Sequence, residues 1–313
     1  MLRFLWPAVL AAAAFGGQPL YELSGQVTPQ EPAFVSLFGA TSPFAAATRS
    51  DAAGRFRFKQ LRPGAYTVAV FISARGEARM TVEVGPGTAD SHRRVSLRLQ
   101  FRDSDFVFGR QHAVSAKQLA VPQRAVREYQ EAQKDLAKHD ADSAVKRLER
   151  AVALAPQFAV AWNELGTIAY RTRKFLRAEE CFREALAQDP DMFEPLVNLG
   201  GVLIDLRKLD EAMEYNLRAV LRRPDDALAN VQLGMTYFQV GSFDLAQKYL
   251  ERARRLDPAH FSLPQLLLAE IHLRRGERRE AVEVLEEFLK LHPDYPQTAK
   301  MRRTIEELRA PAR

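Results

Sequence analysis

The chain is 313 residues long, 27% of them charged, and carries a formal net charge of +6. That length allows two domains, and the single cysteine, Cys181, excludes a disulfide within the chain. The positive surplus lies entirely in residues 1–120, which hold 14 Lys and Arg against 8 Asp and Glu, because residues 121–313 hold 31 of each.

The first 17 residues have the parts of a secretory signal peptide. Arg3 supplies a positive charge, residues 4–15 are apolar, and Gly16 and Gly17 are small. The apolar run is too short to span a membrane, and no later segment approaches the roughly 20 apolar residues that a spanning helix needs. No cysteine follows the run, which excludes a bacterial lipoprotein. We therefore expect an exported chain, periplasmic or extracellular, which stays anchored by its N-terminus if the segment is not cleaved.

Residues 20–102 show the two-residue period of β-strands. Phe56 and Phe58 alternate with Arg55, Arg57 and Lys59, so the aromatic rings face one side and the cations the other. The same alternation recurs at 95–102, and 20–27, 33–38, 65–72 and 78–84 are further strand candidates. Gly, Pro and Asp clusters separate these runs. Six or seven short strands predict a small antiparallel β-sandwich whose aromatic side chains point inward.

Part of this segment resembles a known module. The pattern consists of Thr48, Ser50, Asp51, Gly54, Phe56, Phe58, Leu61, Pro63, Gly64, Tyr66 and Val68. It resembles the carboxypeptidase regulatory-like domain, which implies a transthyretin-like β-sandwich that is an accessory module and not a catalytic one. The physical reading agrees, because Asp51 and Gly54 suit a turn and Pro63 with Gly64 suits a type II turn.

The β-rich segment also carries the surplus of cations. One face of the predicted sandwich would hold Arg55, Arg57, Lys59, Arg94, Arg98 and Arg102. Such a face would contact an anionic envelope surface or an acidic partner. The alternative is that these side chains keep the domain soluble and protect the sheet edges from pairing with other strands.

Residues 103–124 form a connector, after which a longer period begins. The stretch from Ala159 to Met192 holds Trp162, Leu165, Gly166, Ala178, Phe182, Ala185 and Pro190. These residue types at these offsets resemble the tetratricopeptide repeat (TPR), a helix-turn-helix unit of about 34 residues. Small residues recur at position 8 of each unit and alanine at position 20, where the two helices of a unit cross and a large side chain would force them apart.

Five repeats follow from this alignment, at 125–158, 159–192, 193–226, 227–260 and 262–295. Residues 296–313 are expected to form a capping helix, over Gln297–Leu308, and a tail. The fold class is therefore multidomain β plus α: a small antiparallel β-sandwich over 20–102, then an α-helical TPR solenoid over 125–295. Asn216 occupies a site in the third repeat that is ordinarily apolar.

In the TPR family the first helix of each unit lines a concave groove through positions 2, 5, 9 and 12, which share one helix face. In this chain those positions are mostly apolar and lack the cationic set that clamps a peptide carboxylate. They predict a groove for an apolar strand or an amphipathic helix of a partner. The alternative is that position 12 packs between repeats. The candidate partner-binding residues are Tyr129, Val160, Asn163, Thr167, Tyr170, Val197, Val231, Met235, Phe238 and Leu266.

Two functions remain open at this stage. The first is a non-enzymatic protein-binding scaffold of the cell envelope, which holds its partner in the TPR groove. The second is a carbohydrate- or envelope-binding accessory protein, in which the sandwich binds and the repeats are a spacer; a solvent-facing row of aromatics on the sandwich would favour it. The six histidines show no metalloprotease spacing, and we find no P-loop or nucleophile motif. We expect no enzyme activity, no metal or other cofactor, and no nucleic-acid partner.

Overall fold

The computed structural model describes residues 19–28, 30–73, 75–102, 105–106 and 120–310. The predicted signal peptide and most of the connector lie outside these residues. The described chain begins with seven strands, which are β1 (Tyr21–Thr28), β2 (Phe34–Gly39), β3 (Ala45–Arg49), β4 (Arg55–Leu61), β5 (Gly64–Ile72), β6 (Gly76–Val84) and β7 (Arg94–Gln100). They form one sheet in the order β4-β1-β7 and a second in the order β3-β2-β5-β6.

The strand alternation buries one face of each sheet against the other. On β4, Phe56 and Phe58 are buried while Arg55, Arg57 and Lys59 are exposed, which confirms the inward aromatics predicted for this strand. The sandwich is not wholly antiparallel, because β1 pairs with β7 in parallel. The prediction of a wholly antiparallel sandwich is wrong for this one pair. Parallel strands need a long connection between them, and here the rest of the domain, from β2 to β6, is that connection.

One predicted turn has the expected geometry, whereas the type II turn predicted at Pro63 and Gly64 is wrong: Gly64 has φ of 151° and already begins β5, and a type II turn needs a φ of about 80° there. In the turn before β4, the Asp51 carboxylate accepts hydrogen bonds from the Ala53 and Arg55 amides, and Gly54 adopts φ of 74°, a conformation that glycine adopts without steric strain. After Gly64, Tyr66 enters the core with 2% of its surface exposed, and its hydroxyl donates to the Arg62 carbonyl over 2.7 Å.

Helices follow in antiparallel pairs, as the 34-residue period predicts. They are α2 (Gln123–Ala137), α3 (Ala141–Leu154), α4 (Ala159–Arg171), α5 (Phe175–Gln188), α6 (Phe193–Asp205), α7 (Leu209–Arg222), α8 (Ala227–Gln239), α9 (Phe243–Leu256), α10 (Pro264–Arg274), α11 (Arg278–Leu291) and α12 (Thr298–Arg309). The predicted fold class, a small β-domain followed by a helical solenoid with a last capping helix, is confirmed.

The glycines at position 8 lie where the two helices of a repeat come close, against the side chain at position 24 of the second helix. A Cβ atom added at Gly166 would lie 2.6 Å from the Phe182 ring, and one at Gly200 would lie 1.9 Å from Oδ1 of Asn216. Both distances are far below van der Waals contact, so only glycine fits beside these neighbours. Asn216 is fully buried and donates to Thr236 Oγ1 over 3.0 Å, which joins the third repeat to the fourth.

The turn inside each repeat shares a backbone feature that the residue types do not predict. Position 15 is left-handed in all five repeats, with φ between 60° and 82°, at His139, Arg173, Arg207, Gly241 and Gly276. Glycine fills this position in the last two repeats, whereas the first three hold residues that adopt it less readily.

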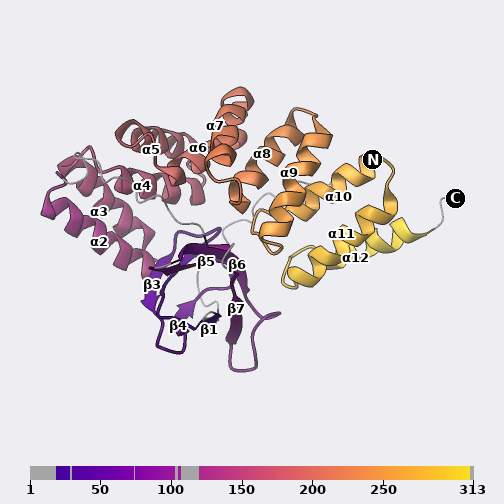
Figure 1. Ribbon diagram of the computed structural model, residues 1–313, viewed down its shortest axis with the longest axis horizontal. Coiled ribbons are helices and arrows are strands. Elements are labelled where there is room, and N and C mark those ends of the chain that lie inside the picture. The colour runs from indigo at the N-terminus through magenta and orange to yellow at the C-terminus, as the bar shows by residue number, and fades with distance from the viewer. Residues whose placement is uncertain (1–18, 29, 74, 103–104, 107–119, 311–313) are drawn as a thin grey trace.

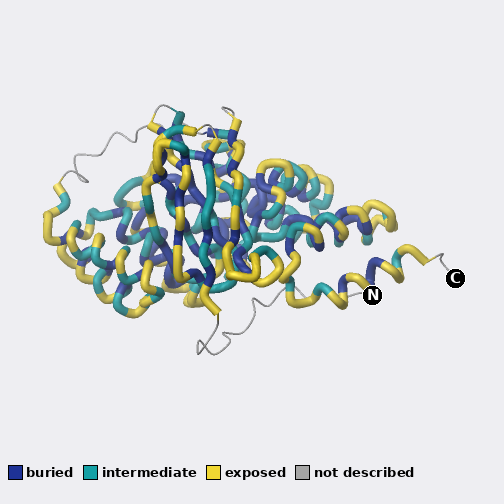
Figure 2. The backbone as a smooth tube through the Cα atoms, turned by 90° about the horizontal axis from the view of Figure 1, so that it is seen from below, coloured by how far each residue is buried: buried dark blue, intermediate teal, exposed yellow. Residues whose placement is uncertain are grey.

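The solenoid curves around the β-domain. In Figure 1 the helices form an arc from α2 to α12, and the strands lie on the inner side of that arc. Figure 2 shows, in a view turned by 90°, that the β-domain stands across the middle of the solenoid and that the buried residues run along both parts. The concave side of the repeats therefore faces a folded domain of the same chain.

Candidate partner-binding surface and the interdomain joints

The predicted groove residues divide into buried and accessible groups. Val231 is 0% exposed, Val197 4% and Asn163 9%. Val231 packs in the core of the last repeats and Val197 in that of the third and fourth. Their assignment to an open surface is corrected, because the close approach of neighbouring repeats covers these positions. Asn163 Oδ1 accepts a hydrogen bond from Asn198 over 3.3 Å, which links the second repeat to the third.

The remaining candidates keep part of their surface accessible. Tyr170 is 38% exposed, and its hydroxyl donates to the Asp205 carboxylate over 2.9 Å. Val160, Thr167, Tyr129, Met235, Phe238 and Leu266 are half-buried. Met235, Phe238 and Leu266 pack against the apolar core of the last two repeats, and the Tyr129 ring lies 5.3 Å from that of Phe158. Tyr170 in the second repeat is therefore the most exposed of the candidates, and Val160 and Thr167 on the same helix keep part of their surface accessible.

The β-domain meets the solenoid at two places, which we call the N-terminal and the C-terminal joint. The N-terminal joint packs β2 and β3 against α2. Ala45 belongs to the same apolar cluster as Leu136, and Phe38 packs against that cluster. The Phe44 ring stacks on His139, with 4.6 Å between centroids, and His139 Nε2 donates to the Gln60 carbonyl over 3.2 Å. Burial lowers the pKa of His139, so the imidazole is uncharged at neutral pH.

The C-terminal joint packs β6 and the turn after it against the ends of α9 and α11. The Thr81 amide donates to Asp257 over 3.0 Å. His292 Nδ1 lies 3.1 Å from Glu83 Oε1, and the Gly87 amide donates to the Asp294 carboxylate over 2.8 Å. Between the two joints an ion pair of 3.5 Å links Arg79 on β6 to Glu194 on α6.

No pattern in the sequence pointed to these contacts. Asp257, His292 and Asp294 follow the ends of second helices, where polar residues are ordinary loop residues. Strand β6 lies at the edge of its sheet, and its outward amides need partners. The edge position explains why these amides need acceptors, but it does not determine which acceptors they find.

Comparisons with known proteins agree on the helical part. A family model described as the cilia and flagella-associated protein 70 middle TPR-like domain matches residues 128–257, and a tetratricopeptide repeat model matches 237–305. Among solved structures, PilW, a type IV pilus biogenesis factor, superposes with a TM-score of 0.53 at 24% identity, covering 60% of this chain and 86% of its own. MamA from Desulfovibrio magneticus RS-1 superposes with a TM-score of 0.50 at 19% identity, covering 56% and 99%.

The residues after the connector form a TPR solenoid. Curated relatives match the chain as well: the human cell division cycle protein 16 homolog is 29% identical over 113 residues, which is 33% of this chain. Anaphase-promoting complex subunit 6 of Arabidopsis thaliana is 32% identical over 99 residues, or 30% of this chain. In each case the match spans 18% of the relative's length. The matching family models describe repeats and indicate no catalytic family.

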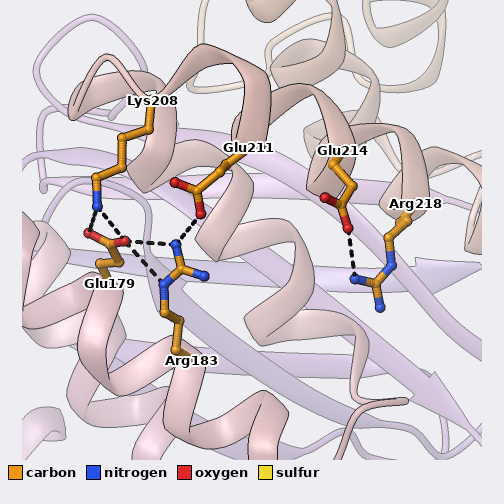
Figure 3. Close-up of polar contacts among 6 residues, drawn as sticks. All are labelled: Glu179, Arg183, Lys208, Glu211, Glu214 and Arg218. Atoms are coloured by element: carbon orange, nitrogen blue, oxygen red, sulfur yellow. Dashed lines mark hydrogen bonds and ion pairs between the residues drawn. The ribbon is translucent and has the colours of Figure 1, made fainter.

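A charged cluster in the TPR solenoid holds two neighbouring repeats together. Figure 3 shows Glu179 of α5 between Arg183 of its own helix and Lys208, which precedes α7, while Arg183 also reaches Glu211. Burial by itself would raise the pKa of Glu179, but the two cations outweigh it and hold that pKa below its ordinary value. A separate, longer pair of 3.8 Å joins Glu214 and Arg218 on α7. We assign this cluster to the contact between the second and third repeats.

The described residues offer little for catalysis or metal binding. Cys181 is buried in the TPR solenoid, and burial raises the pKa of its thiol to about 11, so the thiol stays protonated and packed at neutral pH. Within the described ranges no group of three or more His, Cys, Asp or Glu side chains is arranged to hold a metal ion. No helix among the same residues has the length and apolar character needed to cross a membrane.

Proposed function

We propose that this protein is a non-enzymatic scaffold of the cell envelope that binds a protein partner through the concave side of its TPR solenoid. The observation that carries the proposal is the accessible strip of the second repeat, where Tyr170 presents a ring whose hydroxyl is held by Asp205. A side chain fixed in this way loses little freedom on binding, which favours its use as an anchor. Val160 and Thr167 lie on the same helix, and the apolar strip suits an apolar or amphipathic segment of the partner.

The proposed location rests on the N-terminal residues. The positive start, the apolar run and the small residues at 16 and 17 support export. The resemblance of residues 48–72 to the carboxypeptidase regulatory-like domain supports a sandwich that spaces or docks the scaffold, and the seven-strand, two-sheet arrangement fits that resemblance.

Site-specific photo-crosslinking in native cells tests the scaffold. A photoreactive phenylalanine analogue at Tyr170 should capture a discrete protein, identified by mass spectrometry. The same analogue at Leu221, an α7 residue that is 71% exposed and lies outside the strip, is the matched control and should not capture it. Equal capture from both positions would mean that the strip is not the binding surface. Thr167→Arg should reduce capture from Tyr170, because it places a bulky charge one turn away.

One observation favours the second candidate, a sandwich that binds carbohydrate or an envelope surface. Phe34 on β2 and Phe71 on β5 are directly paired across the sheet and are 50% and 42% exposed. The Arg49 guanidinium lies 4.4 Å from the Phe34 ring centre. These rings are an exception to the inward aromatics of the domain, and an exposed aromatic pair is a feature of interaction sites.

The basic face of the sandwich also favours a role in binding an envelope surface. Arg55, Arg57, Lys59, Arg94 and Arg98 are exposed on the outer side of the β4-β1-β7 sheet. Asp51 pairs with Arg55 over 2.8 Å and Asp90 with Arg94 over 3.2 Å, so part of this charge is neutralised within the domain. Phe34→Ser with Phe71→Ser, and separately Arg57→Glu with Arg98→Glu, should leave partner capture from Tyr170 intact if the scaffold proposal holds. Loss of capture only in these variants would favour the sandwich as the binding module.

A further inference from the structure

An open pocket lies at one end of the β4-β1-β7 sheet. Its volume is about 540 Å³, and its lining residues come from the start of β1, the end of β4 and the turn before β7. Strand pairing brings these segments together, because Glu22 on β1 pairs with Arg94 on β7 and lies beside Lys59 of β4 on its other side. Figure 1 shows β1, β4 and β7 farther from the helical arc than β5 and β6. The pocket is therefore separate from the concave strip that holds Tyr170.

A β-bulge shapes the β4 side of this pocket. The pairing of β1 with β4 shifts register here, so that Lys59 and Gln60 both lie opposite the single residue Glu22. Regular alternation would bury one of the two, yet both are exposed. Both line the pocket. Bulges re-aim side chains in this way and are frequent next to active sites.

The turn before β7 repeats the geometry of the turn before β4, except at one residue. In each turn an aspartate, Asp51 or Asp90, accepts hydrogen bonds from the amides two and four positions later. In each turn the residue three positions after the aspartate is left-handed: Gly54 with φ of 74° and Arg93 with φ of 59°. The same backbone therefore carries glycine in one turn and arginine in the other.

The arginine has a cost that glycine avoids. Glycine adopts the left-handed conformation without steric strain, and arginine does not. At Gly54 a Cβ would also lie 2.7 Å from the Val27 carbonyl oxygen, whereas position 93 accommodates an exposed side chain. Gln60 is left-handed as well, with φ of 59°, and among the described residues of the β-domain it and Arg93 are the non-glycine residues with this conformation. Both line the pocket, and strain of this kind gathers at functional sites.

The charge of the pocket is positive and partly uncompensated. Arg94 is paired within its own turn, but in the part of the chain that the structure describes no carboxylate lies within ion-pair distance of Lys59 or Arg93. Glu22 also lines the pocket, and its carboxylate pairs with Arg57 over 3.7 Å. Two unpaired cations in one concavity attract an anion.

We propose that this pocket binds the phosphate monoester group of a polar ligand. Lys59, Arg93 and Arg94 line it together with the Ser91 hydroxyl. A phosphate monoester offers three acceptor oxygens and up to two negative charges, which suits three cations and a hydroxyl better than the two oxygens of a carboxylate. The planar guanidinium matches phosphate geometry. A pocket of this volume holds more than one phosphate group, so the phosphate belongs to a larger molecule, a lipid headgroup or a soluble ester.

Inorganic phosphate is the first probe, added to the full chain at pH 7.5 against chloride at equal ionic strength. The backbone amide NMR shifts of Gln60, Ser91 and Arg93 should move saturably below about 50 mM phosphate. Arg93→Gly should weaken binding at least about fivefold, because it removes a charge-assisted contact. The same variant should keep or raise the melting temperature, because glycine relieves the backbone strain. Binding lost without stability separates a ligand-binding side chain from a structural one.

Two further variants control for the general charge of the sheet. Arg98 lies on the same outer face of β7 but not among the residues that line the pocket. Arg98→Gln removes the same charge as Arg93→Gly and should change the phosphate affinity by less than about twofold. Glu22→Gln removes the carboxylate from the pocket and should strengthen binding at least about twofold, because the repulsion of the anion is lost.

Vesicles identify the source of the phosphate group. Phosphatidylcholine vesicles with and without phosphatidic acid, whose headgroup is a phosphate monoester, are sedimented with the full chain. Every variant shares residues 1–19, so any membrane affinity of the apolar run enters each measurement equally. Binding that needs phosphatidic acid, is lost in Arg93→Gly and is kept in Arg98→Gln assigns the group to a lipid headgroup. Saturable phosphate binding with no such difference between vesicles assigns it to a soluble ester.

Two results would overturn the site. The first is that the amides of Gln60, Ser91 and Arg93 do not respond to phosphate. The second is an equal loss of affinity in Arg93→Gly and Arg98→Gln, which would mean that the anion responds to the charge of the whole face and not to the pocket. The site goes beyond the scaffold function, and partner capture from Tyr170 enters none of these measurements, so the two proposals succeed or fail separately.

Discussion

The two joints hold the β-domain on the solenoid by different kinds of contact, one apolar and the other polar. At the N-terminal joint Phe38, Ala45 and Leu136 share one apolar cluster, and His139 adds a ring stack. At the C-terminal joint Asp257, His292 and Asp294 hold backbone amides and a carboxylate of the β-domain. Apolar contact depends little on pH or salt, whereas the polar contacts depend on both. The difference indicates that the first joint is a fixed attachment and the second an adjustable one.

The largest effect is expected at the fixed attachment. Phe44 is 2% exposed and contacts both Tyr66 and His139. Phe44→Ala should lower the free energy of unfolding by about 3–5 kcal/mol, because it leaves a cavity in the β-core and removes the ring stack. Chemical denaturation measures the change. Phe71→Ala, at an exposed ring of the same domain, should change stability by less than about 0.5 kcal/mol. Equal losses in the two variants would contradict the account of this joint.

A smaller loss is expected at the adjustable joint. Asp257→Ala leaves the buried Thr81 amide without an acceptor, which should cost about 1–3 kcal/mol. Asp257→Asn keeps an acceptor oxygen and should lose less. Denaturation of both variants at pH 7.5 gives the comparison. Should alanine and asparagine behave alike, the carboxylate would not be the acceptor that holds β6.

The left-handed turn residues offer a matched pair within the solenoid. Arg173 and His139 have φ of 60° and 61° at the same position of adjacent repeats, but only His139 contacts the β-domain. Arg173→Gly should stabilise the chain by up to about 1 kcal/mol by removing backbone strain. His139→Gly removes the same strain together with the stack on Phe44, so it should be neutral or destabilising. A gain of equal size at both positions, in thermal unfolding, would show that the His139 contact adds nothing.

The smallest effect is expected between the joints. Arg79 pairs with Glu194 over 3.5 Å, and its side chain is 40% exposed. Arg79→Ala should cost less than about 1 kcal/mol, and the difference from the unsubstituted chain should shrink further in high salt. A loss that is large or insensitive to salt would mean that a third joint exists here.

The sequence predicts the parts of this molecule better than their assembly. From the recurring small residues we predicted repeats that begin at Ala159, Phe193 and Ala227. Helices α4, α6 and α8 begin at these residues. These features come from local periods, which side-chain volume and helix geometry enforce. Alternation likewise placed Phe56 and Phe58 inside the sandwich.

We did not predict the joints, because no local pattern in the sequence determines contacts between residues that are far apart in the chain. Thr81 and Asp257 are 176 positions apart, and His292 and Glu83 are 209 apart. The exposed groove was overestimated for a related reason, since burial of Val231 and Val197 depends on how closely neighbouring repeats approach. The same limit applies to Phe34 and Phe71, whose exposure depends on how the sheet faces its surroundings.

One covalent test addresses the central claim, that the β-domain is docked on the concave side of the solenoid. A Cβ built on Gly85 lies 3.8 Å from the Asp294 Cβ, which is the separation that a disulfide requires. With Cys181→Ser as background, Gly85→Cys and Asp294→Cys should form a disulfide under mild oxidation at pH 7.5, detected by intact mass and by mobility without reductant. Arg57→Cys with Asp294→Cys, which places the first thiol on the outer face of the other sheet, should not. Free thiols at 85 and 294 in a chain of normal helical content would contradict the docked arrangement.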